Sequence, residues 1–374
     1  MVDRQFGLYV HWPFCQAKCP YCDFNSHVVS SIDQAKWAAA YEAEIARVKD
    51  DKPDAVLNTV FFGGGTPSLM APETLERVMR KIRETWPVAN DFEVTLEANP
   101  TSAEAARFQA YAALGVNRVS IGVQALNDED LRSLGRLHNA DEAVLAVNLA
   151  KASFDRVSFD LIYARQNQTL TAWEAELREA LDLAVDHLSL YQLTIEPGTA
   201  FGDRLARGGL AGLPEEDLAA DMYELTQELT AGEGLHAYEV SNHSKPGAES
   251  RHNLIYWRAG DWLGIGPGAH GRFMKDGKRI ATETHLAPVT WLGAVAQGSG
   301  EVLRSELTST DQQAEELMMG LRLSEGVPQH KFSELYNKFN ALVDDGLIND
   351  NNGRFRATPS GRLVLNALLR HLLA

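Results

Sequence analysis

The stretch FGLYVHWPFCQAKCPYC, residues 6–22, decides the fold. Residues 6–12 are largely apolar and aromatic, and they predict a buried strand. Cys15, Cys19 and Cys22 follow with the spacing C-x3-C-x2-C, so a tight loop after the strand would bring three thiolates together. They are the only cysteines of the chain, and an odd number within eight residues indicates a metal site rather than a disulfide framework.

The three thiolates narrow the kind of metal site. Soft thiolates select zinc or iron–sulfur clusters, and a structural zinc site requires four protein ligands. His11 could be the fourth, but a side chain within the strand would point away from the loop that follows it. Three cysteines can instead hold a [4Fe–4S] cluster and leave one iron with an exchangeable coordination position. We therefore expect this cluster on Cys15, Cys19 and Cys22, with zinc as the alternative.

Beyond the cysteines, the chain repeats a strand followed by a helix. Six strands are predicted, at residues 6–12, 56–62, 92–98, 118–124, 156–163 and 187–195. Apolar residues at helical spacing fill the gaps, as in the stripes Trp37, Tyr41, Ile45, Val48 and Leu75, Val78, Met79, Ile82. Six successive units predict an α/β fold, a partial (β/α)6 barrel with functional groups at the carboxyl ends of its strands. A doubly wound open sheet is the alternative.

The rest of the chain predicts two further parts. We assign residues 1–235 to the partial barrel, 236–300 to a connecting region with its own packing, and 301–374 to a C-terminal winged-helix-like α+β domain. Residues 302–374 contain eight Lys and Arg against nine Asp and Glu, so the basic face that DNA binding requires is missing. We expect this domain to have a structural or partner-docking role.

The composition restricts partners and compartment. The formal net charge of −16 repels phosphate backbones and anionic membrane surfaces, so nucleic acid is not an expected partner. No eighteen apolar residues run together, and Met1 leads directly into the first strand without the segments of an export signal. We therefore expect a cytoplasmic protein with at most peripheral membrane association.

The cysteine motif and its place after the first strand resemble the radical S-adenosylmethionine superfamily. The resemblance implies that the amino and carboxylate groups of S-adenosylmethionine chelate the open iron of the cluster. It also implies that an electron from the cluster can break a sulfonium C–S bond and release a 5′-deoxyadenosyl radical.

Candidate cofactor contacts follow the ends of the predicted strands. By the same resemblance, the loop Gly63-Gly64-Gly65-Thr66 meets the methionyl amino group, so Gly64, Gly65 and Thr66 are candidates. Glu97 could accept hydrogen bonds from ribose hydroxyls, and Gln124 ends the fourth strand similarly. Arg136 could neutralise the cofactor carboxylate, and Asp160 could supply another polar contact. Tyr9 and Tyr21, beside the cysteine motif, complete the expected cofactor-binding set.

Four stretches narrow the resemblance within the superfamily. Residues 8–15, 63–68, 97–100 and 120–124 are similar to the oxygen-independent coproporphyrinogen III oxidase group across almost the whole chain. The oxidase extends its motif with a fourth cysteine two residues after the third, where this chain has Phe24. That pattern is similar to the HemW-type haem chaperones. The sequence RHNLIYW at residues 251–257 also resembles their H-N-x-x-Y-W motif.

The second motif makes His252 the expected haem ligand, because a neutral imidazole can bind haem iron axially. Tyr256 and Trp257 could lie against the macrocycle, while His243 and His270 are alternative ligands. No C-x-x-C-H sequence for covalent haem attachment is present. One departure follows Asp160: the family commonly has Gly-Leu-Pro where this chain has ARQN at residues 164–167.

The expected function is therefore a haem chaperone with a [4Fe–4S] cluster and S-adenosylmethionine, which delivers haem to haem-accepting respiratory proteins. A homodimer is possible on this interpretation. The alternative is an oxidase that decarboxylates coproporphyrinogen III by a radical route, and the missing fourth cysteine argues against it. A winged-helix regulator is disfavoured by the acidic charge balance.

Overall fold

Six parallel strands form the centre of the protein. A computed structural model describes residues 5–374, so the expectation about Met1 lies outside the described residues. The strands are paired in chain order without reversal. They are β1 (Phe6–Trp12), β4 (Leu57–Gly64), β5 (Val88–Ala98), β6 (Arg118–Gln124), β7 (Arg156–Tyr163) and β8 (His187–Gln192). This order confirms the partial barrel, whereas a doubly wound sheet would reverse direction at its middle.

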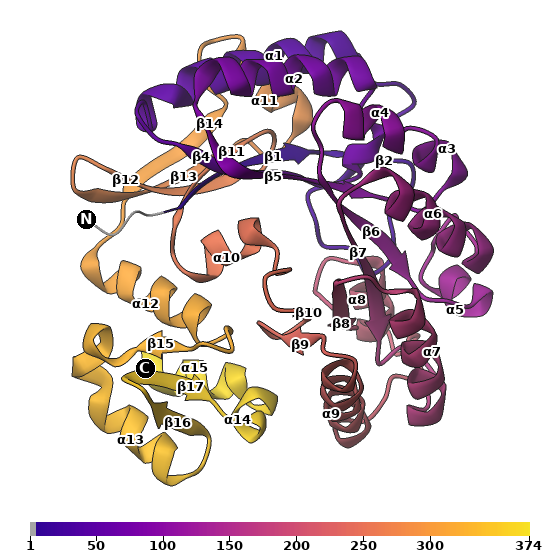
Figure 1. Cartoon of the computed structure of the whole chain (residues 1–374), viewed down its shortest axis with the longest axis vertical. Helices are drawn as coiled ribbons and strands as arrows, with labels where there is room; N and C mark the ends of the chain where they lie inside the picture. The colour runs from indigo at the N-terminus through magenta and orange to yellow at the C-terminus, as the bar shows by residue number, and fades with distance from the viewer. Residues whose placement is uncertain (1–4) are drawn as a thin grey trace.

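Helices cover the outer side of the arc that these strands make (Figure 1). They are α1 (Gln34–Val48), α2 (Pro72–Thr85), α3 (Ser102–Ala105), α4 (Phe108–Ala113), α5 (Asp128–Ser133), α6 (Ala140–Ser153), α7 (Leu170–Leu183), α8 (Ala200–Ala206) and α9 (Glu216–Gly232). Both predicted apolar stripes, on α1 and α2, are buried in the main core. Gly115, at φ 99°, ends α4 one residue after its cap, because glycine adopts the left-handed conformation freely.

The sheet continues beyond the six strands at both edges. β10 (Asn242–Ser244) pairs antiparallel with β8, and β9 (His236–Ala237) pairs with β10. At the other edge, β11 (Asp261–Ile265) pairs parallel with β1 and is followed by β12 (His270–Lys275), β13 (Lys278–Thr284) and β14 (Glu301–Glu306). The expected connecting region 236–300 therefore does not have packing of its own. Its strands find partners on the barrel sheet, which gives their backbone groups hydrogen bonds.

The C-terminal domain has its own small sheet and core. Its three antiparallel strands lie in the order β15 (Val327–Pro328), β17 (Arg354–Ala357), β16 (Ile348–Asn351). Its helices are α12 (Ser309–Gly320), the 3-10 helix η3 (Gln329–Leu335), α13 (Tyr336–Asp344), α14 (Pro359–Leu363) and α15 (Leu365–Leu373). Phe339 stacks on Phe355 with ring centroids 4.0 Å apart. Within residues 5–374, no helix has the length and apolar character needed to cross a bilayer.

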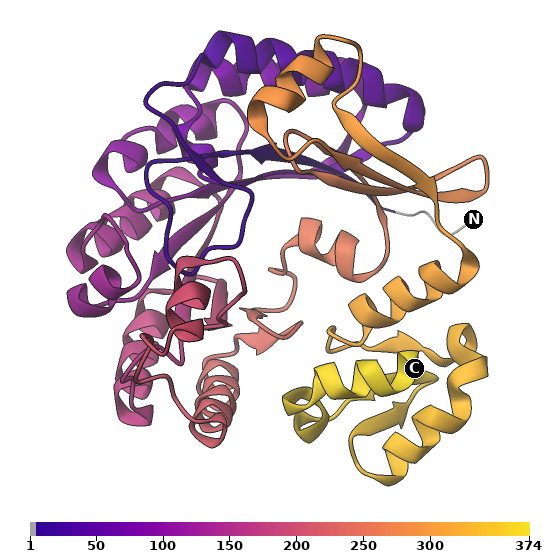
Figure 2. The same ribbon diagram turned by 180° about the vertical axis from the view of Figure 1, so that it is seen from behind.

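Five further short elements lie between those already described. The strands β2 (Phe14–Cys15) and β3 (His27–Val28) pair in parallel and close the base of the cysteine loop. Two 3-10 helices, η1 (Lys49–Asp51) and η2 (Pro67–Leu69), follow α1 and β4. The helix α11 (Pro288–Val295) packs on α1, with Trp291 stacked on Trp37 at 5.5 Å. Figure 2 shows the loop after β1 reaching the segment around α8, where the Phe201 N–H donates to the Pro20 carbonyl.

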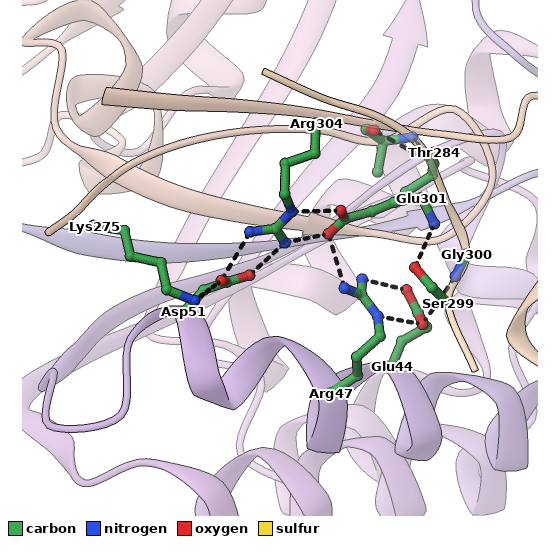
Figure 3. A network of polar contacts seen from close by, with 10 residues as sticks. Glu44, Arg47, Asp51, Lys275, Thr284, Ser299, Gly300, Glu301 and Arg304 are labelled. Atoms are coloured by element: carbon green, nitrogen blue, oxygen red, sulfur yellow. Dashed lines mark hydrogen bonds and ion pairs between the residues drawn. The ribbon is translucent and has the colours of Figure 1, made fainter. Parts of the chain in front are cut away.

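A network of charged residues fastens the added strands to the barrel (Figure 3). Arg47 of α1 contacts Glu44 and Glu301, at 2.8 and 2.9 Å. Asp51 contacts Arg304 of β14 and Lys275 of β12, each at 2.7 Å. Burial would raise the pKa of Asp51, but the hydrogen bonds from Arg304 and Lys275 outweigh it and lower that pKa. The network therefore joins α1 to strands more than 200 residues later, as the 224-residue separation of Asp51 and Lys275 shows.

Replacing Asp51 with asparagine is expected to lower the free energy of unfolding by about 1–2 kcal/mol, because two cations lose a carboxylate whose side chain is only 5% exposed. The loss stays below that of a fully buried pair because Lys275 and Arg304 each remain partly exposed to solvent. Urea unfolding of the wild type and of the Asp51→Asn variant measures this loss. The matched control Glu306→Gln removes the exposed pair with Lys278 and should change stability by less than about 0.5 kcal/mol. Equal effects of the two variants would contradict this account of the network.

Candidate functional site

The three cysteines line one small cavity at the carboxyl end of the barrel, with a volume of about 140 Å³. The Cys22 N–H donates to the Cys19 carbonyl at 3.2 Å, which makes the turn between them tight. Thr66 Oγ1 donates to Cys15 Sγ, and the Arg136 guanidinium donates to Cys19 Sγ, both at 3.4 Å. Burial raises the pKa of the Cys15 and Cys22 thiols, although nearby donors oppose it. The loop thus gathers three soft ligands.

The donor set fits an iron–sulfur cubane. Across the described part of the chain, no three His, Cys, Asp or Glu side chains are close enough to bind one metal ion together. A cubane differs from a single ion because each thiolate binds a different iron. His11, the alternative fourth ligand of zinc, has both ring nitrogens engaged, Nδ1 with the Tyr9 hydroxyl and Nε2 with the Asn25 carbonyl.

The glycine-rich loop after β4 forms the next wall of this cavity. Gly64 has φ 110°, and a Cβ there would lie 2.5 Å from the His11 ring. At Gly65, a Cβ would lie 2.7 Å from the Phe14 carbonyl oxygen. The Gly65 N–H donates to the Trp12 carbonyl at 2.7 Å and the Thr66 N–H to the Phe14 carbonyl at 2.8 Å. The glycines therefore let this loop lie directly against the start of the cysteine loop.

Two buried carboxyl groups stand beside that loop. Glu97 Oε2 accepts from the Gly64 N–H at 3.1 Å, and burial and then the nearby Asp160 raise the pKa of Glu97 to about 8. Asp160 accepts from Ser120 Oγ at 3.2 Å, and burial raises its pKa to about 6. At pH 7 Glu97 is therefore mostly protonated and can donate a hydrogen bond, while Asp160 is mostly ionised and can only accept.

Gln124 and Arg136 reach the same cavity from β6 and the loop after α5. Gln124 has φ 74°, an unusual conformation for a residue with a side chain, and such outliers cluster at functional sites. Arg136 donates to the Asn99 side chain at 2.5 Å and the Gly122 carbonyl at 2.8 Å, while its buried Nε has no partner. That unpartnered donor suits an anionic group.

Asn99 was missed as a site residue by the sequence analysis. Its side chain joins Arg136 to Thr66, donating to Thr66 Oγ1 at 3.0 Å. The sequence Glu97-Ala98-Asn99-Pro100 contained it, and a polar residue two positions after Glu97 was the available signal.

The two tyrosines predicted as cofactor contacts, Tyr9 and Tyr21, line different cavities. Tyr21 lines the cysteine cavity together with Cys15, Cys19 and Cys22. Tyr9 does not line that cavity; it faces a second one and stacks near Phe61, with ring centroids 6.3 Å apart.

This second cavity has a volume of about 550 Å³ and is lined by residues of the barrel strands, α10 and α12. Its walls share aromatic character, through Tyr9, Phe24, Phe61, Tyr191, Tyr256, Trp257 and Trp262. Five residues line both cavities, so the two adjoin: Phe24, Gly64, Glu97, Ser120 and Asp160. Phe24, which stands where the oxidase group has its fourth cysteine, is 61% exposed between them.

Arg118 is another residue that sequence reasoning missed. It lines the larger cavity, is 3% exposed, and donates to Ser158 Oγ at 3.0 Å. No carboxylate lies within 4 Å of its guanidinium in residues 5–374. A charged residue at the start of a predicted strand gave no sign that it would point into the barrel.

His252 lies at the opposite end of the barrel from the cysteines. It belongs to α10 (Arg251–Trp257), whose first N–H groups donate to Glu93 and which crosses the inner side of the sheet (Figure 1). Its ring lies against Gly7, and five residues of β1, roughly 16 Å, separate Gly7 from Trp12 at the carboxyl end.

His252, the expected haem ligand, has both ring nitrogens engaged within the protein. Nδ1 is 2.7 Å from Thr59 Oγ1, Nε2 is 2.6 Å from the Tyr256 hydroxyl, and none of the residue is exposed. Burial and then Arg118 lower its pKa to about 3, so the ring is neutral. Of the alternatives, His243 is fully buried and bonded to Gln227, whereas His270 lines the larger cavity.

The departure after Asp160 has a structural explanation. Arg165 is 3% exposed and contacts Glu176 at 2.5 Å and Asp130 at 2.7 Å, so this loop is fixed by ion pairs. Ala164, at the family's glycine position, has φ 57°. None of residues 164–167 lines the cysteine cavity.

Replacing Ala164 with glycine is expected to change the free energy of unfolding by less than about 0.5 kcal/mol. Relief of the left-handed backbone at φ 57° gains about 1–2 kcal/mol, and loss of the buried methyl group together with the greater freedom of glycine in the unfolded chain offsets that gain. Thermal or urea unfolding checks it. The matched control Ala175→Gly, on the exposed side of α7, should lose about 1 kcal/mol. Equal losses in both variants would contradict the argument.

Comparisons with known proteins agree with this geometry. Residues 9–180 match the radical SAM superfamily, and residues 307–364 match the HemN C-terminal domain. The heme chaperone HemW of Haemophilus influenzae is 38% identical over 98% of this chain and 97% of its own length. The chain belongs to the HemW family. The mitochondrial radical S-adenosyl methionine domain-containing protein 1 of Bos taurus is also 38% identical, over 100% of this chain and 88% of its own.

A solved structure shares the architecture of this HemW-family chain. Coproporphyrinogen III oxidase (HemN) from Escherichia coli covers 99% of this chain and 90% of its own, with a TM-score of 0.82 and 23% identity. At that identity the likeness concerns the fold alone, and it confirms a barrel followed by a C-terminal domain, while the match at residues 9–180 assigns the barrel to the radical SAM superfamily. The family expected from Phe24 and the motif at residues 251–257 is confirmed by the HemW relatives.

Proposed function

We propose that this protein binds haem as cargo, carries a [4Fe–4S] cluster with S-adenosylmethionine, and acts as a haem chaperone. The observation that carries the proposal is the pair of adjoining cavities. One gathers three cysteines, and the other, about 550 Å³ and walled by aromatic side chains, has the size and character of a site for a flat apolar ligand. The HemW relatives, named heme chaperones, support haem as that ligand.

Different residues of the smaller cavity would bind the cluster and S-adenosylmethionine. Cys15, Cys19 and Cys22 would hold the cluster, which when bound supplies an electron to the sulfonium of S-adenosylmethionine. The Arg136 guanidinium, with its unpartnered Nε, would hold the cofactor carboxylate. The Gly64, Gly65 and Thr66 backbone would receive the methionyl amino end.

The carboxyl groups of Glu97 and Asp160 are suited to hydrogen-bonding with the ribose of S-adenosylmethionine. Protonated Glu97 can donate to one ribose hydroxyl, and ionised Asp160 can accept from another polar group. Gln124 and Tyr21 line the same cavity and would complete the contact. Tyr9 faces the larger cavity and would contact the cargo instead.

The proposal extends to partners and compartment. We infer that haem passes to haem-accepting respiratory proteins, in the cytoplasm, with at most peripheral association with the membrane. A homodimer is part of the same proposal. The net charge of −16 supports a protein partner with a basic docking face rather than an anionic membrane or nucleic acid.

Anaerobic reconstitution followed by two parallel assays tests the function. Ferric haem is titrated into the protein, and coproporphyrinogen III is supplied with S-adenosylmethionine and a reductant. We expect saturable haem binding with about one haem per chain and no decarboxylated product. Vigorous formation of protoporphyrinogen would instead favour the oxidase, the alternative interpretation of the same superfamily.

A further inference from the structure

Two histidines line the larger cavity, His11 and His270, and they differ in what their ring nitrogens do. His11 holds the Tyr9 hydroxyl and the Asn25 carbonyl, so its lone pair and its N–H are both used. Neither ring nitrogen of His270 has a hydrogen-bond partner among residues 5–374. Its side chain is 54% exposed, which leaves it accessible to a ligand that enters the cavity.

The backbone around His270 is held in place while its ring is left free. The residue begins β12, and its carbonyl accepts from Trp262 Nε1 at 3.1 Å. A Cβ on Gly264 would lie 2.2 Å from the same carbonyl oxygen, so only glycine lets the strands approach this closely. Trp262 in turn meets Tyr256 edge-on at 4.8 Å. His270 therefore stands beside a fixed aromatic wall.

A carboxylate stands behind the imidazole. His270 pairs across the ladder with Glu283 of β13, and Nδ1 lies 3.8 Å from Glu283 Oε1. Histidines that bind a metal usually direct the other ring nitrogen at a carboxylate, which orients the ring and strengthens the ligand. The arrangement leaves His270 Nε2 as the nitrogen for iron.

A second potential ligand, Met319 of α12, lines the same cavity as His270. Arg272, two residues along β12, contacts Glu315 of α12 at 3.0 Å. Met319 lies four residues, about one helical turn, after Glu315 on α12, so it is close to the place where this helix meets β12. A thioether opposite an imidazole is a known axial pair for haem iron.

We propose that haem binds in the larger cavity through His270 Nε2 and the Met319 thioether, with Glu283 as a positioning residue for the imidazole. This inference rests on the proposed haem-binding function. It assigns the iron to the seam between the barrel edge and the C-terminal domain. On this assignment His252 does not bind the iron. Its hydrogen bond with the Tyr256 hydroxyl orients one ring of the aromatic wall of the cavity.

Titration of ferric haem, followed by the Soret band, tests the assignment with the full chain. His270→Ala should weaken haem binding by more than about tenfold and shift the band, because the iron loses its strongest ligand. Met319→Leu should change the spectrum with a smaller loss of affinity. His330→Ala, an exposed histidine outside the cavity, is the matched control and should bind as the wild type.

Two further variants separate ligation from folding. His270→Gly should recover the wild-type spectrum when free imidazole is added, since imidazole can occupy the vacated position. Glu283→Gln should keep haem bound but raise its reduction potential, because a neutral amide gives the ring less electron density. An unchanged Soret band and affinity in His270→Ala would overturn the assignment. Absence of haem binding by the wild type would instead contradict the proposed function itself.

Discussion

Serine at position 19 in place of cysteine is expected to abolish the iron–sulfur cluster. The cluster needs all three thiolates, and this chain has no other cysteine to replace the lost one. Iron after anaerobic reconstitution should fall from about four atoms per chain to background, together with the visible absorbance of the cluster. Cys15→Ser and Cys22→Ser should behave alike, because the three side chains line one cavity.

A residue of the same loop supplies the control. Lys18 is exposed between Cys15 and Cys19 and does not line the cysteine cavity, so Lys18→Ala should keep the full complement of iron. A cysteine variant that retained all its iron and its spectrum would show that the cluster has another ligand set. Circular dichroism of each variant confirms that the barrel is folded.

Acidification between pH 6 and 5 is expected to destabilise the protein without cofactors, because unfolding then takes up protons on balance. Five buried histidines have a lowered pKa, in each case chiefly through burial: His11, His138, His187, His243 and His252. Each stays neutral in the folded protein but takes up a proton below about pH 6.5 when unfolded. Their stabilising effect is therefore complete above that pH and is lost as the pH falls.

Three buried carboxyl groups oppose this trend. Glu97, Asp160 and Glu104 have a raised pKa, first through burial, so the folded protein keeps protons there that the unfolded chain releases. The five histidines outnumber these three carboxyl groups, so unfolding takes up protons on balance and the free energy of unfolding falls as the pH falls. Urea unfolding at pH 6.0, 5.5 and 5.0 measures it.

Single histidine variants make the pH experiment specific. His252→Gln should reduce the slope by about 1 kcal/mol per pH unit, because it removes one of the protons taken up on unfolding. His330→Gln, at an exposed position, should leave the slope unchanged. A wild-type stability that did not vary between pH 6 and 5 would contradict the neutral, buried state of these rings.

The six barrel strands could be predicted because each carries a local signal. Strands β1, β6 and β7 begin and end where the sequence pattern places them, and the apolar stripes of α1 and α2 fit a helix packed on a sheet. The extension of the sheet could not be predicted in the same way. β11 pairs with β1 across about 250 residues of chain, and no local pattern specifies so distant a partner.

The residues of the candidate site also fall into those with a local sequence signal and those whose surroundings depend on distant parts of the chain. Gly64, Thr66, Glu97 and Arg136 could be placed from strand ends and motif resemblance, since carboxyl ends of parallel strands meet at one edge. The surroundings of His252 depend on Thr59 and Tyr256, one of which is 193 residues away. A histidine with both nitrogens hydrogen-bonded, as His252, and one without a hydrogen bond to its ring, as His270, look alike in a sequence.

The central claim is that this barrel holds haem as cargo beside a cluster site. Its most direct test is equilibrium titration of ferric haem into the reconstituted wild-type protein, with coproporphyrinogen III and S-adenosylmethionine turned over in parallel. We expect saturation near one haem per chain, a Soret band of ligated haem, and no decarboxylation. Rapid decarboxylation by a protein that binds no haem would contradict the claim.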